Sequence, residues 1–145
     1  MNLKEILSIS GKSGLYKLVS RNKNGIIVES LIDKKRFPAF GVDKVSALGD
    51  ISIFAVDRDI PLKDVMKLIY EKENGGMAID HKADPKLLKT YMEEVLPDYD
   101  SERVYVSDMK KLFYWYNILV QENMLDFTEE ETETTDNVVD ESTEK

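Results

Sequence analysis

Residues 112–120 read Leu-Phe-Tyr-Trp-Tyr-Asn-Ile-Leu-Val, and every one of them except Asn117 is apolar or aromatic. A helix that is apolar around most of its circumference is typical of the centre of a core, or of a surface buried against a partner chain. Ser107 and Asp108 are helix-capping residue types, so we expect the helix to run from there to about Asn123. The first interpretation makes it the helix around which the fold packs. The second makes it a self-association interface, formed by Phe113, Trp115, Tyr116 and Ile118. A third makes it part of an aromatic ligand pocket.

Two shorter helices are predicted before this segment. Pro61 suits a first helical turn, and apolar residues then recur at helical spacing as far as Ile69. Asn74-Gly75-Gly76 predicts the end of that helix. Asp84-Pro85 combines a capping residue with a proline at the first helical position, which predicts a second helix ending near Pro97. Residues 104–106 are predicted to form a short strand.

Residues 15–56 are predicted to form short strands with tight turns. Asn24-Gly25 suits the positive φ angles of a type I′ turn and gives the strongest hairpin signal in the chain. A second turn is expected at residues 33–35, before a strand in which Pro38 cannot donate to a ladder, so that strand belongs at an edge, at a bulge or in a short element. Residues 51–56 are predicted as a further strand. This pattern indicates a small SH3-like or Sm-like barrel, or a curled antiparallel sheet packed on helices.

Charge divides the 145-residue chain into three parts. Residues 1–56, the predicted barrel or sheet, carry a net +4; residues 57–127, the predicted three-helix part, carry −5; and residues 128–145 carry −7. The last segment has too few large apolar residues to offset its ordering entropy, which predicts a disordered acidic tail. The fold class is therefore α+β, with an N-terminal sheet, a helical C-terminal part and a tail.

The chain has no cysteine, which excludes disulfides and thiolate metal sites and fits a reducing compartment. Residues 1–5 lack the pattern of a signal peptide, and no apolar run approaches the roughly 18 residues of a spanning helix. We therefore expect a cytoplasmic protein that does not enter a membrane.

Gly11-Lys12-Ser13-Gly14 has two functional interpretations, both of which fail on context. A P-loop needs another glycine five positions before Gly11, where this chain has Ile6, and it must open a helix. The Gly-x-x-Gly of KH domains also lies between helices. Because a strand is expected after Gly14, we interpret the segment as a turn.

The predicted barrel carries a group of basic residues that could attract phosphates, with Tyr16 and Phe37 as stacking rings for RNA or another single strand. The excess of positive charge is small, so an ordinary solvated surface is the competing interpretation. The basic residues at issue are Lys17, Arg21, Lys34, Lys35 and Arg36.

No pattern specifies a reaction, a metal or a cofactor. Asp98-x-Asp100-x-Glu102 begins like a calcium loop, but Arg103 and Met109 stand where that loop needs glycine and glutamate. His81 is the only histidine, and without Cys it cannot be part of a typical transition-metal site. Recognition of DNA by a helix-turn-helix is rejected because the third helix is too apolar.

Four stretches together resemble a known family: residues 3–19, residues 24–31, residues 44–48 and residues 104–111. They are similar to small bacterial proteins built from two domains of unknown function in tandem, and the resemblance spans residues 1–127. It implies a bacterial cytoplasmic protein and brings no functional residues with it.

The leading hypothesis is a non-enzymatic binding or adaptor module that self-associates through the third helix or a sheet edge. The alternative is binding of RNA or single-stranded nucleic acid by the basic face. An enzyme that uses carboxylates in a pocket between the two halves is the third class.

Overall fold

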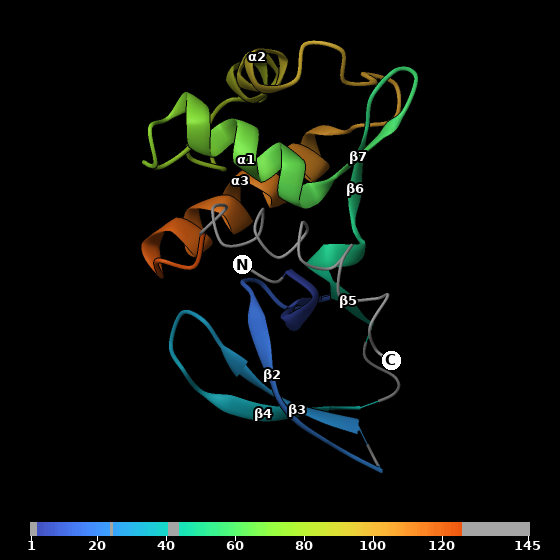
Figure 1. Ribbon diagram of the computed structural model, residues 1–145, viewed down its shortest axis with the longest axis vertical. Helices are drawn as coiled ribbons and strands as arrows, with labels where there is room; N and C mark the ends of the chain where they lie inside the picture. Colours follow the sequence, from blue (N-terminus) through green and yellow to red (C-terminus); the bar gives the residue numbers. More distant parts are fainter. Residues whose placement is uncertain (1–2, 24, 41–43, 126–145) are drawn as a thin grey trace, which may run out of the picture.

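The computed structural model describes residues 3–23, 25–40 and 44–125. Its two halves lie one above the other along the long axis, with a β-sheet below and three helices above (Figure 1). The acidic segment predicted to be disordered, residues 128–145, lies outside the described residues.

The lower half is one antiparallel sheet of five strands in the order β4-β3-β2-β1-β5. A short 3-10 helix, η1 (Leu3–Glu5), precedes the sheet and a second, η2 (Leu48–Asp50), follows it. The strands are β1 (Ile6–Ile9), β2 (Tyr16–Asn22), β3 (Gly25–Ser30), β4 (Arg36–Phe40) and β5 (Val45–Ala47).

The predicted hairpin around residues 24 and 25 is confirmed, since β2 pairs with β3 and Asn22 lies opposite Gly25. The Gly25 N–H also donates to Asn22 Oδ1 at 3.0 Å. Residue 24 itself is not among the described residues, so the type of turn is not assigned. Pro38 lies in β4, at the edge of the sheet, where a residue without an N–H is tolerated.

The expected barrel is wrong: the sheet is not closed. Residues 51–56 do not extend it, because β6 (Ser52–Phe54) pairs instead with β7 (Asp59–Pro61) in a separate two-stranded hairpin. The alternative of an antiparallel sheet packed on helices describes the fold. β1, which lies between β2 and β5, was not predicted from the sequence.

The three helices are α1 (Leu62–Lys72), α2 (Pro85–Val95) and α3 (Val106–Gln121). Asp84 caps α2 as predicted, and its carboxylate accepts from the Lys86 N–H at 2.9 Å. The strand predicted at residues 104–106 is wrong, because α3 already begins at Val106. The start of α3 is fixed by Asp108, whose Oδ2 accepts from the Tyr105 N–H at 2.9 Å.

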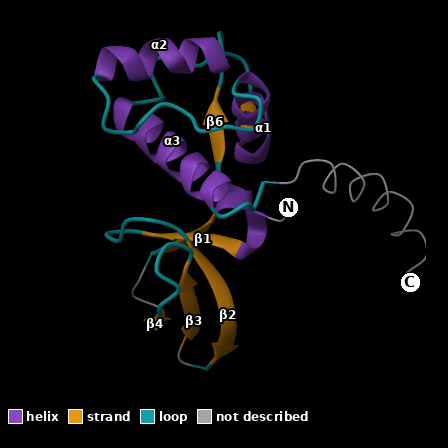
Figure 2. Cartoon of the chain, turned by 90° about the vertical axis from the view of Figure 1, so that its left-hand side faces the viewer, coloured by secondary structure: helices purple, strands orange, loops and turns teal. Residues whose placement is uncertain are grey.

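The two halves share one hydrophobic core. Figure 2 shows α3 crossing between α2 and the sheet. Its side chains Leu112, Phe113 and Leu119 are all at most 1% exposed. The same core includes five residues of the sheet half: Leu3, Ile6, Leu15, Leu31 and Leu48. A smaller second cluster, with Val28 at its centre, lies on the sheet alone.

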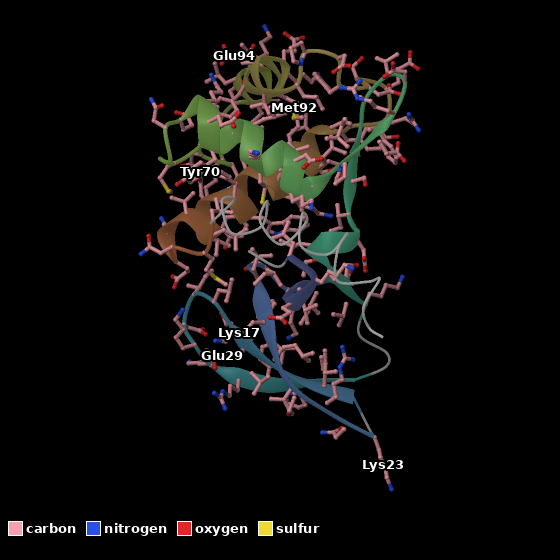
Figure 3. All side chains as sticks on the ribbon, viewed as in Figure 1. Lys17, Lys23, Glu29, Tyr70, Met92 and Glu94 are labelled. Carbon is pink, nitrogen blue, oxygen red and sulfur yellow. The ribbon has the colours of Figure 1, made fainter. Side chains whose placement is uncertain are left out.

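Polar contacts at the edge of the core join α3 and α2 to α1 and the segment after it. The Tyr116 hydroxyl donates to the Gly76 carbonyl at 2.9 Å, and the buried Asn117 Oδ1 accepts from the Ala78 N–H at 2.7 Å. The Lys72 Nζ of α1 lies 2.8 Å from a carboxylate oxygen of Glu94 on α2. Figure 3 labels Glu94 and its buried neighbour on α2, Met92.

Replacement of Phe113 tests whether α3 is a core helix. We expect Phe113→Ala to lower the free energy of unfolding by about 3–5 kcal/mol, because a fully buried ring leaves a cavity. Lys110→Ala, on an exposed position of the same helix, is the control and should change it by less than about 0.5 kcal/mol. Urea denaturation measures both. A Phe113→Ala protein with unchanged stability and an altered oligomeric state would contradict this assignment.

Candidate functional site

A cleft of about 530 Å³ lies between the sheet half and α3. Its walls come from segments far apart in the sequence: the end of β1 and the turn after it, the start of β5, and the middle of α3. We call it the basic cleft. Its lining residues are Ser8, Ile9, Ser10, Gly11, Lys12, Ser13, Gly14, Lys44, Ser46, Ile51, Lys111, Tyr114 and Trp115.

One wall of the basic cleft is the turn from Ser10 to Gly14, the segment that resembled a phosphate-binding loop. The Lys12 N–H donates to the Ile9 carbonyl at 3.0 Å, and the Ser10 N–H donates to the Lys44 carbonyl at 2.9 Å. Gly14 has a φ of +90°, and a Cβ there would lie 3.3 Å from Ile32 Cδ1. The interpretation as a turn is confirmed, because the segment joins β1 to β2 and opens no helix.

The opposite wall is one face of α3. Lys111, Tyr114 and Trp115 are three and four positions apart, and this spacing brings their side chains to the same side of a helix. Both aromatic residues are half-buried. The Tyr114 ring also packs against the His81 ring, with centroids 4.4 Å apart, so its position is held from outside the helix.

Positive charge dominates the basic cleft. Three of its lining residues are lysines, four are serines and none is acidic. Within the described part of the chain, Lys44 and Lys111 make no ion pair. The Lys12 Nζ lies 5.0 Å from the centroid of the Phe37 ring, a contact that leaves its charge unneutralised. Ammonium and hydroxyl groups together are the donors that bind anionic oxygens.

The basic residues predicted from the sequence do not gather into one site. Lys17 and Arg36 flank Glu29 on the sheet: Arg36 Nε donates to Glu29 Oε1 at 2.8 Å, and Lys17 Nζ lies 3.9 Å from Oε2. Figure 3 shows Lys17 and Glu29 side by side on the sheet, and Lys23 at the far tip of the hairpin. The Arg36 hydrogen bond is the main reason that the pKa of Glu29 lies below its ordinary value.

The other three predicted residues are dispersed. Lys34 Nζ forms an ion pair with Glu122 Oε1 at 2.8 Å, and Lys35 is exposed beside it in the β3–β4 turn. Arg21 lines a different groove, on the apolar face of the sheet near Leu18 and Ile26. Tyr16, proposed as a stacking ring, is 7% exposed and donates its hydroxyl to the Ser13 carbonyl at 2.7 Å. These positions do not form a continuous basic face.

Three of the four residues predicted for a partner interface on α3 lie inside the chain's own core. Phe113 and Tyr116 are 0% exposed and Ile118 is 4% exposed, so they are not surface residues. Burial in the core explains why this helix is so apolar. Trp115, the fourth, is half-buried and lines the basic cleft. Self-association through a sheet edge stays a prediction.

Two of the carboxylates considered for calcium binding or acid–base chemistry, Asp98 and Asp100, are held in ion pairs. Asp98 Oδ2 accepts from Arg58 at 2.6 Å, and Asp100 Oδ2 accepts from Arg103 at 2.8 Å. These hydrogen bonds hold the pKa of both carboxyl groups below their ordinary range. Over residues 3–23, 25–40 and 44–125, no three His, Asp or Glu side chains are grouped so as to hold a metal ion. In the same ranges, no helix is long and apolar enough to cross a membrane.

The fold and the basic cleft define an α+β protein of two units joined through one core. Residues 3–48 match the model of a domain of unknown function (DUF5606), and residues 51–119 match another (DUF6852). The solution NMR structure of a structural genomics target from Bacteroides vulgatus is 48% identical and covers 87% of this chain and 91% of its own, with a TM-score of 0.74. A search of curated proteins finds no match.

The chain belongs to the family in which these two domains of unknown function follow one another. The predicted resemblance to tandem domains is confirmed. The match to the first domain covers η1 to β5, and the match to the second covers β6 to most of α3. The basic cleft takes Lys12 and Lys44 from the first domain and Lys111 and Trp115 from the second.

A pocket between the two halves was considered from the sequence only as an enzyme site with carboxylates, and the lysines of the basic cleft were not predicted to meet. The signal nearest to it was the placement of Lys111, Tyr114 and Trp115 on one face of a helix that is otherwise apolar. Of these three residues, only Trp115 was predicted to have a functional role, in the partner interface. Nothing in the spacing of residues 11–14, 44 and 111 shows that they meet. Residues 11–14 and 44 are brought together by the pairing of β1 with β5, and residue 111 by the packing of α3 on the sheet.

Titration of Glu29 tests the ion pairs that neutralise the predicted basic face. We expect Arg36→Gln to raise the pKa of Glu29 toward its ordinary value, and Lys17→Gln to raise it less, because Arg36 makes the shorter contact. Carboxyl carbon chemical shifts followed by NMR measure the pKa. An unchanged value in Arg36→Gln would contradict the assignment.

The lowered pKa of Glu29 also determines how the stability of the fold changes with pH. Because the pKa of Glu29 is lower in the folded protein, its stabilisation is present above the unfolded value of about 4.3 and is lost as the pH falls through the folded value. The wild-type protein should therefore lose more stability than Arg36→Gln when the pH is lowered through this range.

Proposed function

We propose that the chain is a non-enzymatic binding module and that its ligand is a single-stranded nucleic acid held in the basic cleft. The observation that supports this most directly is the meeting of Lys12, Lys44 and Lys111 with the Trp115 ring in a cleft that no described acidic residue lines. Lysines attract phosphates, and an aromatic ring offers a stacking surface to a base. In this proposal the phosphates are bound by these three lysines and not by the five basic residues predicted from the sequence.

Binding is favoured over catalysis by the kinds of side chain in the basic cleft. Its described lining contains ammonium groups, hydroxyl groups and aromatic rings, which position an anionic ligand. The lining includes no carboxylate or imidazole, the groups that most often transfer protons in an active site. The phenol of Tyr114 and the indole of Trp115 are groups that recognise a ligand by contact and stacking.

A single strand fits the basic cleft better than a duplex. A ring such as Trp115 can stack only on a base whose face is unpaired and unstacked. The volume of about 530 Å³ lies in the range of small-ligand pockets, so the cleft takes a short stretch of a strand. The net charge of −8 does not oppose this, because residues 128–145 alone contribute −7.

The three lysines can be tested by measuring the salt dependence of binding. We expect the full chain to bind a short labelled single-stranded oligonucleotide, and Lys12→Gln, Lys44→Gln and Lys111→Gln combined to weaken that binding. The slope of log affinity against log salt should become shallower by about 2, since each phosphate contact on a single strand contributes about 0.7. Fluorescence anisotropy of the labelled strand measures both quantities.

The control removes the same charge elsewhere. Lys23, Lys86 and Lys89 are exposed, lie outside the basic cleft and make no ion pair within the described residues, so their combined change to Gln should leave the slope nearly unchanged. An equal loss in both variants would contradict the proposal. A free mononucleotide that competes as well as the oligonucleotide would assign the basic cleft to nucleotides instead.

The acidic segment provides an independent test. We expect binding at low salt to tighten when the eight Asp and Glu residues among residues 128–145 are replaced by their amides in the full chain. The reason is that a −7 segment competes with phosphates for the same lysines and repels the strand. The effect should disappear at high salt, where charges are screened. Unchanged affinity at low salt would show that the segment does not compete.

A further inference from the structure

A second, smaller hollow adjoins the basic cleft along α3. Its volume is about 210 Å³, and it shares Ile51, Lys111 and Trp115 with the cleft, so the two hollows are neighbours along this helix. We call this hollow the apolar slot. Beyond the shared residues, its lining includes the exposed Ser52 and two half-buried residues, Asp108 and Phe54. The Arg103 guanidinium lies 4.3 Å from the centroid of the Phe54 ring.

The two hollows differ in chemistry. The basic cleft presents lysines and serines, whereas the apolar slot is floored by the buried residues Ile53, Leu62 and Leu112. A ligand that fills both therefore has an anionic part joined to a flat or apolar part. A nucleotide has this composition, because one sugar carries the phosphate on one side and the base on the other. The Trp115 ring, which lines both hollows, lies where the two parts meet.

Asp108 gives the apolar slot a polar edge. Its Oδ2 accepts from the Tyr105 N–H at 2.9 Å and so caps α3. Its Oδ1 makes no hydrogen bond within the described part of the chain, which leaves one carboxylate oxygen to accept from a ligand at the rim. An ionised carboxylate can only accept, so it favours a base edge that presents an amino group over one that presents carbonyl oxygens.

We propose that the apolar slot is a nucleobase subsite that prefers an amino-bearing base. This inference rests on the proposed function and adds to it the part of the ligand that the lysines do not recognise. Cytosine and uracil are nearly equal in size, and cytosine presents an amino group where uracil presents a carbonyl oxygen. The pair therefore separates the role of Asp108 from simple stacking.

The experiment compares three single strands of equal length on the wild-type full chain: oligo(dC), oligo(dU) and a strand of abasic sugar phosphates. We expect the abasic strand to bind about tenfold more weakly than oligo(dC), because it cannot stack. Oligo(dU) should bind at an intermediate level. Trp115 is the only tryptophan, so its fluorescence should be quenched by oligo(dC) and unchanged by the abasic strand.

The variant Asp108→Asn tests the polar edge. Asparagine keeps an oxygen that can cap α3, and it replaces the second acceptor by a donor, so the preference for oligo(dC) over oligo(dU) should disappear or reverse. Lys110→Gln, on the same helix and outside both hollows, is the control and should keep the preference.

The outcomes separate the two proposals. If none of the three strands binds, the proposed function is wrong. If all three bind equally, or if oligo(dC) and oligo(dU) bind equally, the basic cleft still holds phosphates and the assignment of the apolar slot is overturned. Retention of the oligo(dC) preference in Asp108→Asn would likewise overturn the role of Asp108.

Discussion

The rest of the structure depends on the burial of α3. This helix contributes Leu112, Phe113, Tyr116 and Leu119 to a core that also includes residues of α1, α2, β6, the segment between α2 and α3, and the sheet half. Close packing of large side chains fixes the rotation of the helix about its axis, since a turn of the helix would expose some of them. The same fixed rotation directs Lys111 and Trp115 toward the β1–β2 turn. The geometry of the basic cleft is therefore a consequence of packing in the core.

Local features of the fold followed from the sequence because they depend on neighbouring residues. The cap at Asp84, the end of α1 before Asn74 and the hairpin closed at Gly25 each rest on the conformational preference of a few adjacent positions. The edge position of β4 was one of the three alternatives predicted from the missing N–H of Pro38.

Features that depend on residues far apart in the sequence could not be predicted from it. Residues 51–56 form a good strand pattern, but the pattern does not say whether the strand pairs with the sheet or with residues 59–61, as it does. The charges on Lys17 and Arg36 suggest a phosphate-binding face until Glu29 is placed between them by the register of β2, β3 and β4. The basic cleft is a further case, since Lys111 is brought to Lys12 and Lys44 only by the packing of α3 on the sheet.

The position of the cleft between the two domains has a consequence for recombination in this family. The boundary between its two domains, after residue 48, runs through both the shared core and the cleft wall. Recombination that replaced the second domain by an unrelated one would expose Leu3, Leu15 and Leu48 to solvent. It would also remove the wall of the basic cleft that α3 forms. Separation of the halves would therefore expose core residues and open the cleft at the same time. The two domains form one structural unit, although each matches its own family model.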